Sequence, residues 1–354
     1  MVTEQEQIML NQIDRIAFVA ENGKIDFVNL NGLGKQLVVG EPVRPLLLTG
    51  KKEYAEFTEG CLSLSMNIAD TMTHVSVLRS DGRDIIIEEP SFVNPDFWAL
   101  SSSSQELRSP LFKAMICADA LANSKEAFTE NQCSQFAELK RNLFQMHRSV
   151  CNMSDVSNSQ KFVELQQENY NIKTLSEELF AKLQSCMSET GHDLKISSKL
   201  PPYFTMINRE LYERAILNLV SNAAKYCSNN KTISIKATGG MHSFSISITN
   251  HVDTTKTQKN QDIFSKYLAE RLVSRERACA GLGLYMVRNT ALYQNGTLLI
   301  NKPSNSRIRF TLNLPIVKPN TKTFRSDSDV VDYAGGYNHI LIELSDILPL
   351  DLYV

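Results

Sequence analysis

The chain has 354 residues, of which 42% are hydrophobic and 21% charged, and its formal net charge is −2. This length allows two or three domains, and the near-neutral charge gives no indication of a nucleic-acid partner or of an anionic membrane. No run of about 18 apolar residues occurs, and the first residues lack the basic and apolar parts of a leader peptide. The 7 cysteines stand apart without a C-x-x-C pair, which favours free thiols. We therefore expect a soluble, cytoplasmic protein.

The first segment, residues 1–95, contains two hairpin signals. Asn22-Gly23 and Asp81-Gly82 each stand between apolar runs that favour strands, and turns of this type need the positive φ that these residues tolerate. Helical material lies between the two hairpins. This order resembles a PAS sensor domain, and the resemblance implies an α/β fold. His74 falls on a predicted strand, where an ordinary structural role is favoured over haem binding.

The second segment, residues 96–158, is predicted to form two helices. Apolar residues recur in each at alternating steps of three and four, which is typical of a coiled-coil seam. The first seam is Leu107, Leu111, Ala114, Ala118 and Leu121, and the second is Phe136, Leu139, Leu143, Met146, Val150 and Met153. One such hairpin has little core of its own, so we expect two copies to form a four-helix bundle in a homodimer. The alternative is that the hairpin packs on a neighbouring domain of the same chain.

The third segment, residues 159–317, alternates helix and strand patterns. Helices are predicted in "LSEELFAKLQSCM", "RELYERAILNLVSNAAKY" and "GLGLYMVRNTALYQ", and strands in "TISIKAT", "SFSISITN", "GTLLIN" and "RIRFTLNLP". The last segment, residues 318–354, begins as a polar linker. It ends in "HILIELSDILPLDLYV", which is apolar enough to dock on another part of the chain, but the sequence does not indicate where.

The stretch "LNLVSNAAKY", residues 217–226, lies in one of these helices although asparagine is a mediocre helix former. At about 100° per residue, the helix has a broad apolar face and a narrow polar stripe that we expect to face outward. The stripe consists of Arg214, Asn218, Ser221, Asn222 and Lys225. A solvated polar face is the simpler interpretation. The stripe also suits an anionic ligand with a hydrated Mg²⁺ ion, because amide oxygens are hard ligands and an ammonium group neutralises phosphate.

A second feature follows after two predicted strands. Gly281 and Gly283 stand at the start of the helix "GLGLYMVRNTALYQ". Glycine lets backbone N–H groups approach a phosphate closely, and the helix N-terminus carries partial positive charge. A lone G-x-G is weak evidence, but its position after the asparagine helix and two strands is informative.

These motifs together resemble those of a known family. "NLVSNAAKY", "GLGLYMVRN", "YQNGTLLI" and "RIRFTLNLP" look like the ATP-binding domain of sensor histidine kinases. "SSQELRSPL", residues 103–111, is similar to the family's phosphoacceptor motif S-H-E-L-R-T-P-L. The resemblance implies an α+β multidomain protein with a Bergerat-type α/β sandwich at residues 159–317. It further implies ATP and Mg²⁺ as cofactors and a response regulator as partner.

The resemblance also implies roles for residues of the asparagine helix. Asn222 matches the family's Mg²⁺-ligating asparagine, and Asn218 would lie beside it. Lys225 would face the phosphates, and Tyr226 would lie near the adenine.

Further roles follow for residues after this helix. Gly281 and Gly283 would provide the hinge and phosphate contacts of the lid loop, and Phe264 lies in "DIFSKY", which resembles the apolar motif before the lid. The family's adenine-binding strand ends in an aspartate followed by glycines, whereas here it ends at Asn250 without them. The asparagine amide oxygen can still accept a hydrogen bond from adenine, although it lacks the charge. Asp253 fits less well by register.

The phosphoacceptor position is the main departure from the family. Gln105 stands where the histidine should be, on the exposed flank of the first seam. The lone pair of its amide nitrogen is delocalised, so it cannot attack a γ-phosphate as an imidazole does. Glu106, the candidate general base, would have no proton to take. His147 is an alternative acceptor, but a surface position between the helices is favoured for it.

Three functions remain open. The first is a histidine kinase that transfers phosphate by an altered route. The second, which we favour, is a signalling protein of this family that binds ATP and Mg²⁺ without ordinary autophosphorylation. The third is an ATP-independent scaffold or partner-binding module with a vestigial nucleotide pocket.

Overall fold

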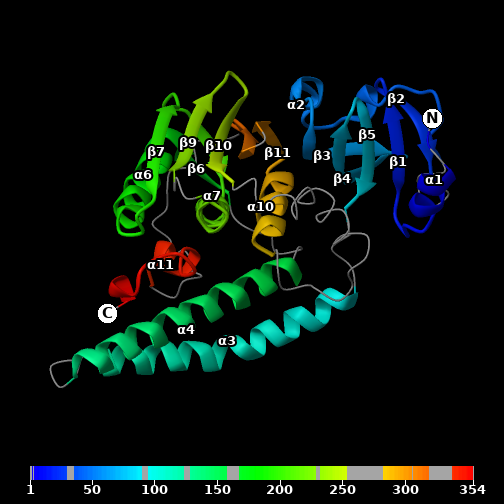
Figure 1. Ribbon diagram of the computed structural model, residues 1–354. Helices are drawn as coiled ribbons and strands as arrows, with labels where there is room; N and C mark the ends of the chain where they lie inside the picture. Colours follow the sequence, from blue (N-terminus) through cyan, green and yellow to red (C-terminus); the bar gives the residue numbers. More distant parts are fainter. Residues whose placement is uncertain are drawn as a thin grey trace.

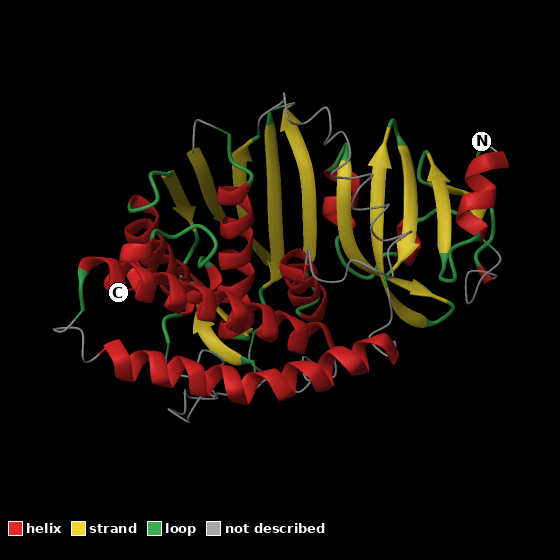
Figure 2. Cartoon of the chain, turned by 60° about the horizontal axis from the view of Figure 1, so that its bottom comes forward, coloured by secondary structure: helices red, strands yellow, loops and turns green. Residues whose placement is uncertain are grey.

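The computed structural model (Figure 1) describes residue 2 and residues 4–29, 36–89, 95–122, 128–157, 167–228, 232–252, 282–304, 306–318 and 337–353. Within these residues, a 10-stranded sheet has the order β2-β1-β5-β4-β3-β11-β12-β10-β9-β7. Its first five strands come from the N-terminal segment, and the other five come from the segment that follows the two long helices. Figures 1 and 2 show these two helices side by side beneath the sheet.

The N-terminal half of the sheet is antiparallel throughout. Its elements are α1 (Glu4–Asn11), β1 (Ala17–Glu21), β2 (Lys24–Val28), the 3₁₀ turn η2 (Arg44–Leu46), α2 (Lys51–Glu56), β3 (Gly60–Ile68), β4 (Thr71–Ser80) and β5 (Arg83–Glu88). The predicted turns at Asn22-Gly23 and Asp81-Gly82 are confirmed, because these residues have positive φ and join paired strands. Ala69-Asp70 forms a further turn with positive φ between β3 and β4, without a glycine.

The other half of the sheet is covered by helices. This part of the chain contains β6 (Glu168–Asn171), α6 (Ile172–Ser188), β7 (Asp193–Lys199), β8 (Phe204–Ile207), α7 (Arg209–Lys225), β9 (Thr232–Gly239), β10 (Ser243–His251), α10 (Leu282–Tyr293), β11 (Thr297–Ser304) and β12 (Arg307–Pro315). Of these strands, β6 and β8 pair with each other in a separate 2-stranded sheet. Helices α6, α7 and α10 pack on its strands. Phe244, Ile246, Ile248 and Asn250 alternate as the buried positions of β10, so Asn250 points to the same face as an apolar core.

Two long helices, α3 (Pro95–Ala122) and α4 (Glu130–Ser157), pack along each other. Their predicted seams are only partly covered within the chain. The buried seam residues include Leu111, Ala118, Phe136, Leu143 and Val150, and the exposed ones include Leu107, Leu121, Leu139 and Met146. Helix α4 also contacts α10 and the short C-terminal helix α11 (His339–Glu343). The hairpin therefore packs on its own chain through α4 and still presents apolar side chains to solvent.

The two halves of the sheet join where β3 pairs with β11. Gly60 lies at this junction with φ of +129°, and a Cβ there would lie 2.2 Å from the carbonyl oxygen of Ile300. Only glycine fits such a position. A buried ion pair of 2.8 Å joins Arg288 of α10 to Glu89, just after β5. The N-terminal half is therefore held directly against α10, which the strand patterns do not predict.

None of the helices in the described ranges combines the length and the apolar character that a membrane span requires.

Candidate functional site

Helix α7 forms where the sequence predicts it, and its position follows from its two faces. The side chain of Asn208 caps its start by accepting a hydrogen bond from the backbone N–H of Leu211 at 2.9 Å. Ile216, Leu219, Val220 and Ala223 are buried in the same core as the strands. Burial of this face fixes the rotation of the helix, so the polar stripe points away from the sheet.

The expectation that the polar stripe faces solvent is wrong. Arg214 is 1% exposed, and Asn218 and Ser221 are 0% exposed. Asn222 is half-buried, and Lys225 lies at the exposed end of the stripe. Polar groups that are fully buried must find partners within the protein. Those partners come from α4 and from residues 337–353, called the C-terminal segment below.

Glu343 of the C-terminal segment lies at the centre of these contacts. Its Oε1 accepts a hydrogen bond from Nε of Arg214 at 3.0 Å. Its Oε2 accepts from Nε of Arg148 at 3.1 Å and from Nδ2 of Asn218 at 2.9 Å. Glu343 is itself 0% exposed. A buried carboxylate is tolerated only when charged partners and hydrogen bonds compensate for its lost hydration.

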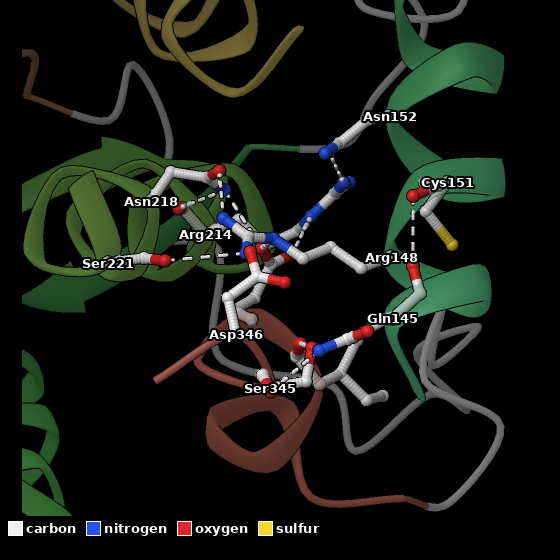
Figure 3. A network of polar contacts seen from close by, with 12 residues as sticks. Gln145, Arg148, Cys151, Asn152, Arg214, Asn218, Ser221, Ser345 and Asp346 are labelled. Atoms are coloured by element: carbon white, nitrogen blue, oxygen red, sulfur yellow. Dashed lines mark hydrogen bonds and ion pairs between the residues drawn. The ribbon is translucent and has the colours of Figure 1, made fainter. Parts of the chain in front are cut away.

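Arg148 reaches the same place from α4 (Figure 3). Its Nη2 donates to Oδ1 of Asn218 at 2.9 Å, and its Nη1 donates to Oγ of Ser221 at 3.3 Å and to Oδ2 of Asp346 at 2.7 Å. Asp346 also forms an ion pair with Lys225. The guanidinium group therefore joins the hairpin to α7 and to the C-terminal segment at once.

Apolar packing holds the C-terminal segment in place. Ile340, Ile342, Leu344 and Leu348 are buried. The Tyr353 ring packs edge-on against Phe144 of α4, with ring centroids 5.5 Å apart. Burial raises the pKa of the Tyr353 phenol, which stays protonated and donates to the carbonyl oxygen of Leu341 at 2.8 Å. The structure thus shows where the apolar end of the chain docks.

The residues assigned to a nucleotide by resemblance lie at and around α7. Tyr226, at the end of the helix, is 66% exposed. Asn250 on β10 is 2% exposed, and its Oδ1 has no hydrogen-bond partner among the described residues. Gly283, in the first turn of α10, lies so close to α7 that a Cβ would come within 2.5 Å of Oδ1 of Asn218. Gly281, Phe264 and Asp253 lie outside the described residues.

Comparison with known proteins adds to this geometry. Residues 207–317 match the family of histidine kinase-, DNA gyrase B-, and HSP90-like ATPases. The sensor protein KdpD of Escherichia coli K12 is 24% identical over 301 residues, which is 82% of this chain and 32% of KdpD. The sensor-like histidine kinase SenX3 of Mycolicibacterium smegmatis is 22% identical over 222 residues, which is 61% of this chain and 56% of SenX3.

Residues 207–317 therefore belong to this ATPase family, and the longer chain is similar to sensor histidine kinases. It spans 32% of the length of KdpD and 56% of that of SenX3. Among solved structures, the histidine kinase AdeS of Acinetobacter baumannii is 18% identical, with 60% of this chain and 97% of that one covered and a TM-score of 0.40. The matched stretch begins at the end of β8 and includes α7, α10 and the strands between and after them.

The residues expected at the phosphoacceptor position by resemblance, Gln105 and Glu106, lie on α3. Gln105 and Glu106 are both exposed. His147 is 0% exposed, its ring lies edge-on to Phe112 at 5.1 Å, and a ring nitrogen lies 3.7 Å from Sγ of Cys151. The expected surface position of His147 is therefore wrong. It lies between the helices, where no nucleotide phosphate can reach it without repacking.

Sequence reasoning missed Arg148, Glu343 and Asp346. Two acidic residues within the apolar run "HILIELSDILPL" were a usable signal, because a carboxylate in a segment that docks needs a cationic partner. The identity of that partner was not readable, since Arg148 and Glu343 are 195 positions apart.

Proposed function

We propose that the chain is a signal-transduction protein of the histidine kinase family that binds ATP with Mg²⁺ beside α7 and does not autophosphorylate in the family's ordinary way. The observation that supports this best is the buried Oδ1 of Asn250, which has no hydrogen-bond partner within the part of the chain that the structure describes. A buried acceptor without a partner is costly, and the amino group of an adenine would satisfy it. Helix α7 contacts β10, and at its end lie the half-buried Asn222 and the exposed Lys225 and Tyr226.

Each of these residues has a chemical role in such a complex. Asn222 would ligate Mg²⁺ through its amide oxygen, and the ion would neutralise phosphate charge. Lys225 would face the phosphates, and Tyr226 would cover the adenine. Gly281 and Gly283 would let backbone N–H groups at the start of α10 approach the phosphates, with Asn218 beside the metal.

Ordinary autophosphorylation is excluded from the proposal because of the residue at position 105. Gln105 is exposed on α3, as a phosphoacceptor must be, but its amide nitrogen is not a nucleophile. Glu106 next to it has no proton to accept. His147 is buried against Phe112, so it does not replace the missing imidazole.

The proposed domains are a PAS-like sensor at residues 1–95, a degenerate phosphoacceptor hairpin at 96–158, the ATP-binding domain at 159–317 and a linker with tail at 318–354. The five antiparallel strands in the order β2-β1-β5-β4-β3, together with the short helices α1 and α2, support the proposal of a sensor domain. The junction of β3 with β11 would carry its signal to α10. A cytoplasmic location and a response regulator as partner complete the proposal.

Nucleotide binding tests the site directly. We expect the full chain to bind a fluorescent ATP analogue, measured by its emission in the presence of Mg²⁺. Asn222→Ala should weaken binding at least about tenfold, because the metal loses a ligand. Asn222→Asp, which keeps an oxygen at this position, should retain binding. Equal affinity of wild type and Asn222→Ala would contradict the assignment of this residue.

The phosphoacceptor argument is tested by restoring the imidazole. With γ-labelled ATP and Mg²⁺, we expect the wild type to acquire no acid-labile, base-stable label and Gln105→His to acquire it. Gln105→Asn, which keeps an amide, should stay unlabelled, as should Gln105→His combined with Asn222→Ala. The label should pass to the receiver domain of a response regulator. Label on the wild type would revive an altered phosphotransfer route.

A homodimer through the hairpin is also proposed. Leu107, Met146, Val150 and Met153 line a groove of about 430 Å³ on α3 and α4. Two of these, Leu107 and Met146, are 47% and 54% exposed. A second hairpin would cover this face and complete both seams.

In sedimentation equilibrium, we expect the wild-type protein to have twice the mass of one chain. Met146→Glu should shift it toward monomer, because a charge would be buried in the interface. Met72→Glu, which changes a residue of β4 that is 58% exposed, should leave the dimer intact. A wild type that is monomeric at every concentration rules out this pairing.

A second candidate function is an ATP-independent scaffold. It is favoured by one observation, which is that Glu343, Asp346 and Arg148 already occupy the polar stripe of α7. In that case, neither the wild type nor any variant that opens the stripe would bind nucleotide.

A further inference from the structure

Two carboxylates of the C-terminal segment lie on side chains that the proposed nucleotide site requires. Asp346 is ion-paired with Lys225, the residue assigned to the phosphates. Glu343 accepts a hydrogen bond from Asn218, the neighbour of the metal ligand. Both contacts place a negative oxygen where a nucleotide would place one.

We propose that the C-terminal segment, residues 337–353, is a built-in competitor of nucleotide, so that ATP with Mg²⁺ binds only when Glu343 and Asp346 leave α7. This regulation rests on the proposed function of the same site. The competitor and the nucleotide share one recognition chemistry, which is the neutralisation of an anion by Lys225 and the amides of α7.

The hydrogen bonds of Asn218 show why both cannot bind together. Its Oδ1 accepts from Arg148 at 2.9 Å. Its Nδ2 donates to the carbonyl oxygen of Arg214 at 3.0 Å and to Glu343 at 2.9 Å. Both N–H groups of the amide are thus in use, so neither can donate to a phosphate oxygen while the segment is docked.

At the exposed end of the stripe, charge repulsion also prevents the segment and a nucleotide from binding together. Lys225 and Asp346 have side chains that are 35% and 28% exposed, so this pair lies at the rim of the contact. A triphosphate next to Lys225 would meet the carboxylate of Asp346 at close range, and like charges at such a distance disfavour each other. Release of Asp346 removes this repulsion and frees the ammonium group.

The docked segment is suited to release because its charged contacts are not strongly stabilising on balance. Removing carboxylates and guanidinium groups from water offsets much of their attraction. Docking therefore depends on the apolar side chains of a short helix, with Ile340 and Ile342 as its buried residues. An anion that competes for the cations shifts this balance.

Release of the C-terminal segment would also change how the hairpin packs against α7. Arg148, Gln145 and Phe144 of α4 each contact the C-terminal segment. The same event that opens the nucleotide site would remove these contacts of α4, while the hydrogen bonds of Arg148 to Asn218 and Ser221 do not involve the segment. Nucleotide binding and the position of the hairpin are thereby coupled through one segment.

The test is the affinity of the full chain for a fluorescent ATP analogue with Mg²⁺. The apparent dissociation constant equals the intrinsic one divided by the fraction of molecules with an open site. Asp346→Asn removes the rim carboxylate with little change in shape, and Glu343→Gln removes the buried one. We expect each to tighten binding about tenfold. Asp351→Asn, which changes an exposed residue of the same segment, should bind as the wild type does.

Glu343→Gln leaves buried guanidinium groups without a carboxylate, so the folding of this variant is checked by thermal unfolding. If Glu343→Gln does not fold, the affinity of Asp346→Asn decides the test. Equal affinity of the wild type, Asp346→Asn and Asp351→Asn for the analogue would contradict the proposal that the C-terminal segment competes with nucleotide. It would not contradict the proposed nucleotide site. Absence of binding in all variants would overturn the proposed function and the competitor together.

Discussion

The carboxylate of Glu343 is bound by guanidinium groups from two distant parts of the chain. The arrangement of α4, α7 and the C-terminal segment depends on this contact. Arg148 belongs to the hairpin and Arg214 to α7, and both are buried with Glu343. Loss of one partner from such a buried set typically costs about 3–5 kcal/mol, because the remaining charge cannot return to water. While residues 337–353 are docked, the three residues therefore determine how α4, α7 and this segment lie against one another. Release of the whole segment does not carry the same cost, because it returns the charges to water together.

This contact changes the meaning of the polar stripe on α7. Asparagines on a helix next to a sheet can serve a ligand or a partner segment, and both need the same donors and acceptors. In the structure, Asn218 serves the partner segment, whereas Asn222 does not contact it in any hydrogen bond among the described residues. While the segment is docked, the two asparagines thus differ in role: Asn218 binds the segment, and Asn222 is left to the proposed metal ion.

The sequence predicted the local structure better than the long-range contacts. The hairpin turns at Asn22-Gly23 and Asp81-Gly82 depend on neighbouring residues, so they could be predicted, as could the apolar face of α7. The burial of Asn218 could not, because its partners Arg148 and Glu343 are 70 and 125 positions away. The Ala69-Asp70 turn was missed because neither residue is glycine. The pairing of β3 with β11 was missed because strand patterns carry no register between distant strands.

The candidate site shows the same limit. Gln105, Asn222 and Lys225 could be found from motifs, because each lies in a short stretch that resembles a known pattern. The segment that covers α7 has no such motif, and only its two acids in an apolar run indicated buried ion pairs. The need for glycine at Gly60 and Gly283 could not be predicted, because it arises from the backbone or side chain that lies opposite each of them in the fold.

Hydrogen exchange of the C-terminal segment tests the central claim most directly. The amides of Ile342 and Leu344 donate within α11 and its cap, so they report docking of this short helix. In the full chain without nucleotide, we expect slow exchange at these amides. Saturating ATP with Mg²⁺ should accelerate it while the amides of α7 remain protected. Unchanged protection of residues 339–344 at a nucleotide concentration that demonstrably fills the site would contradict the claim that the segment and the nucleotide compete.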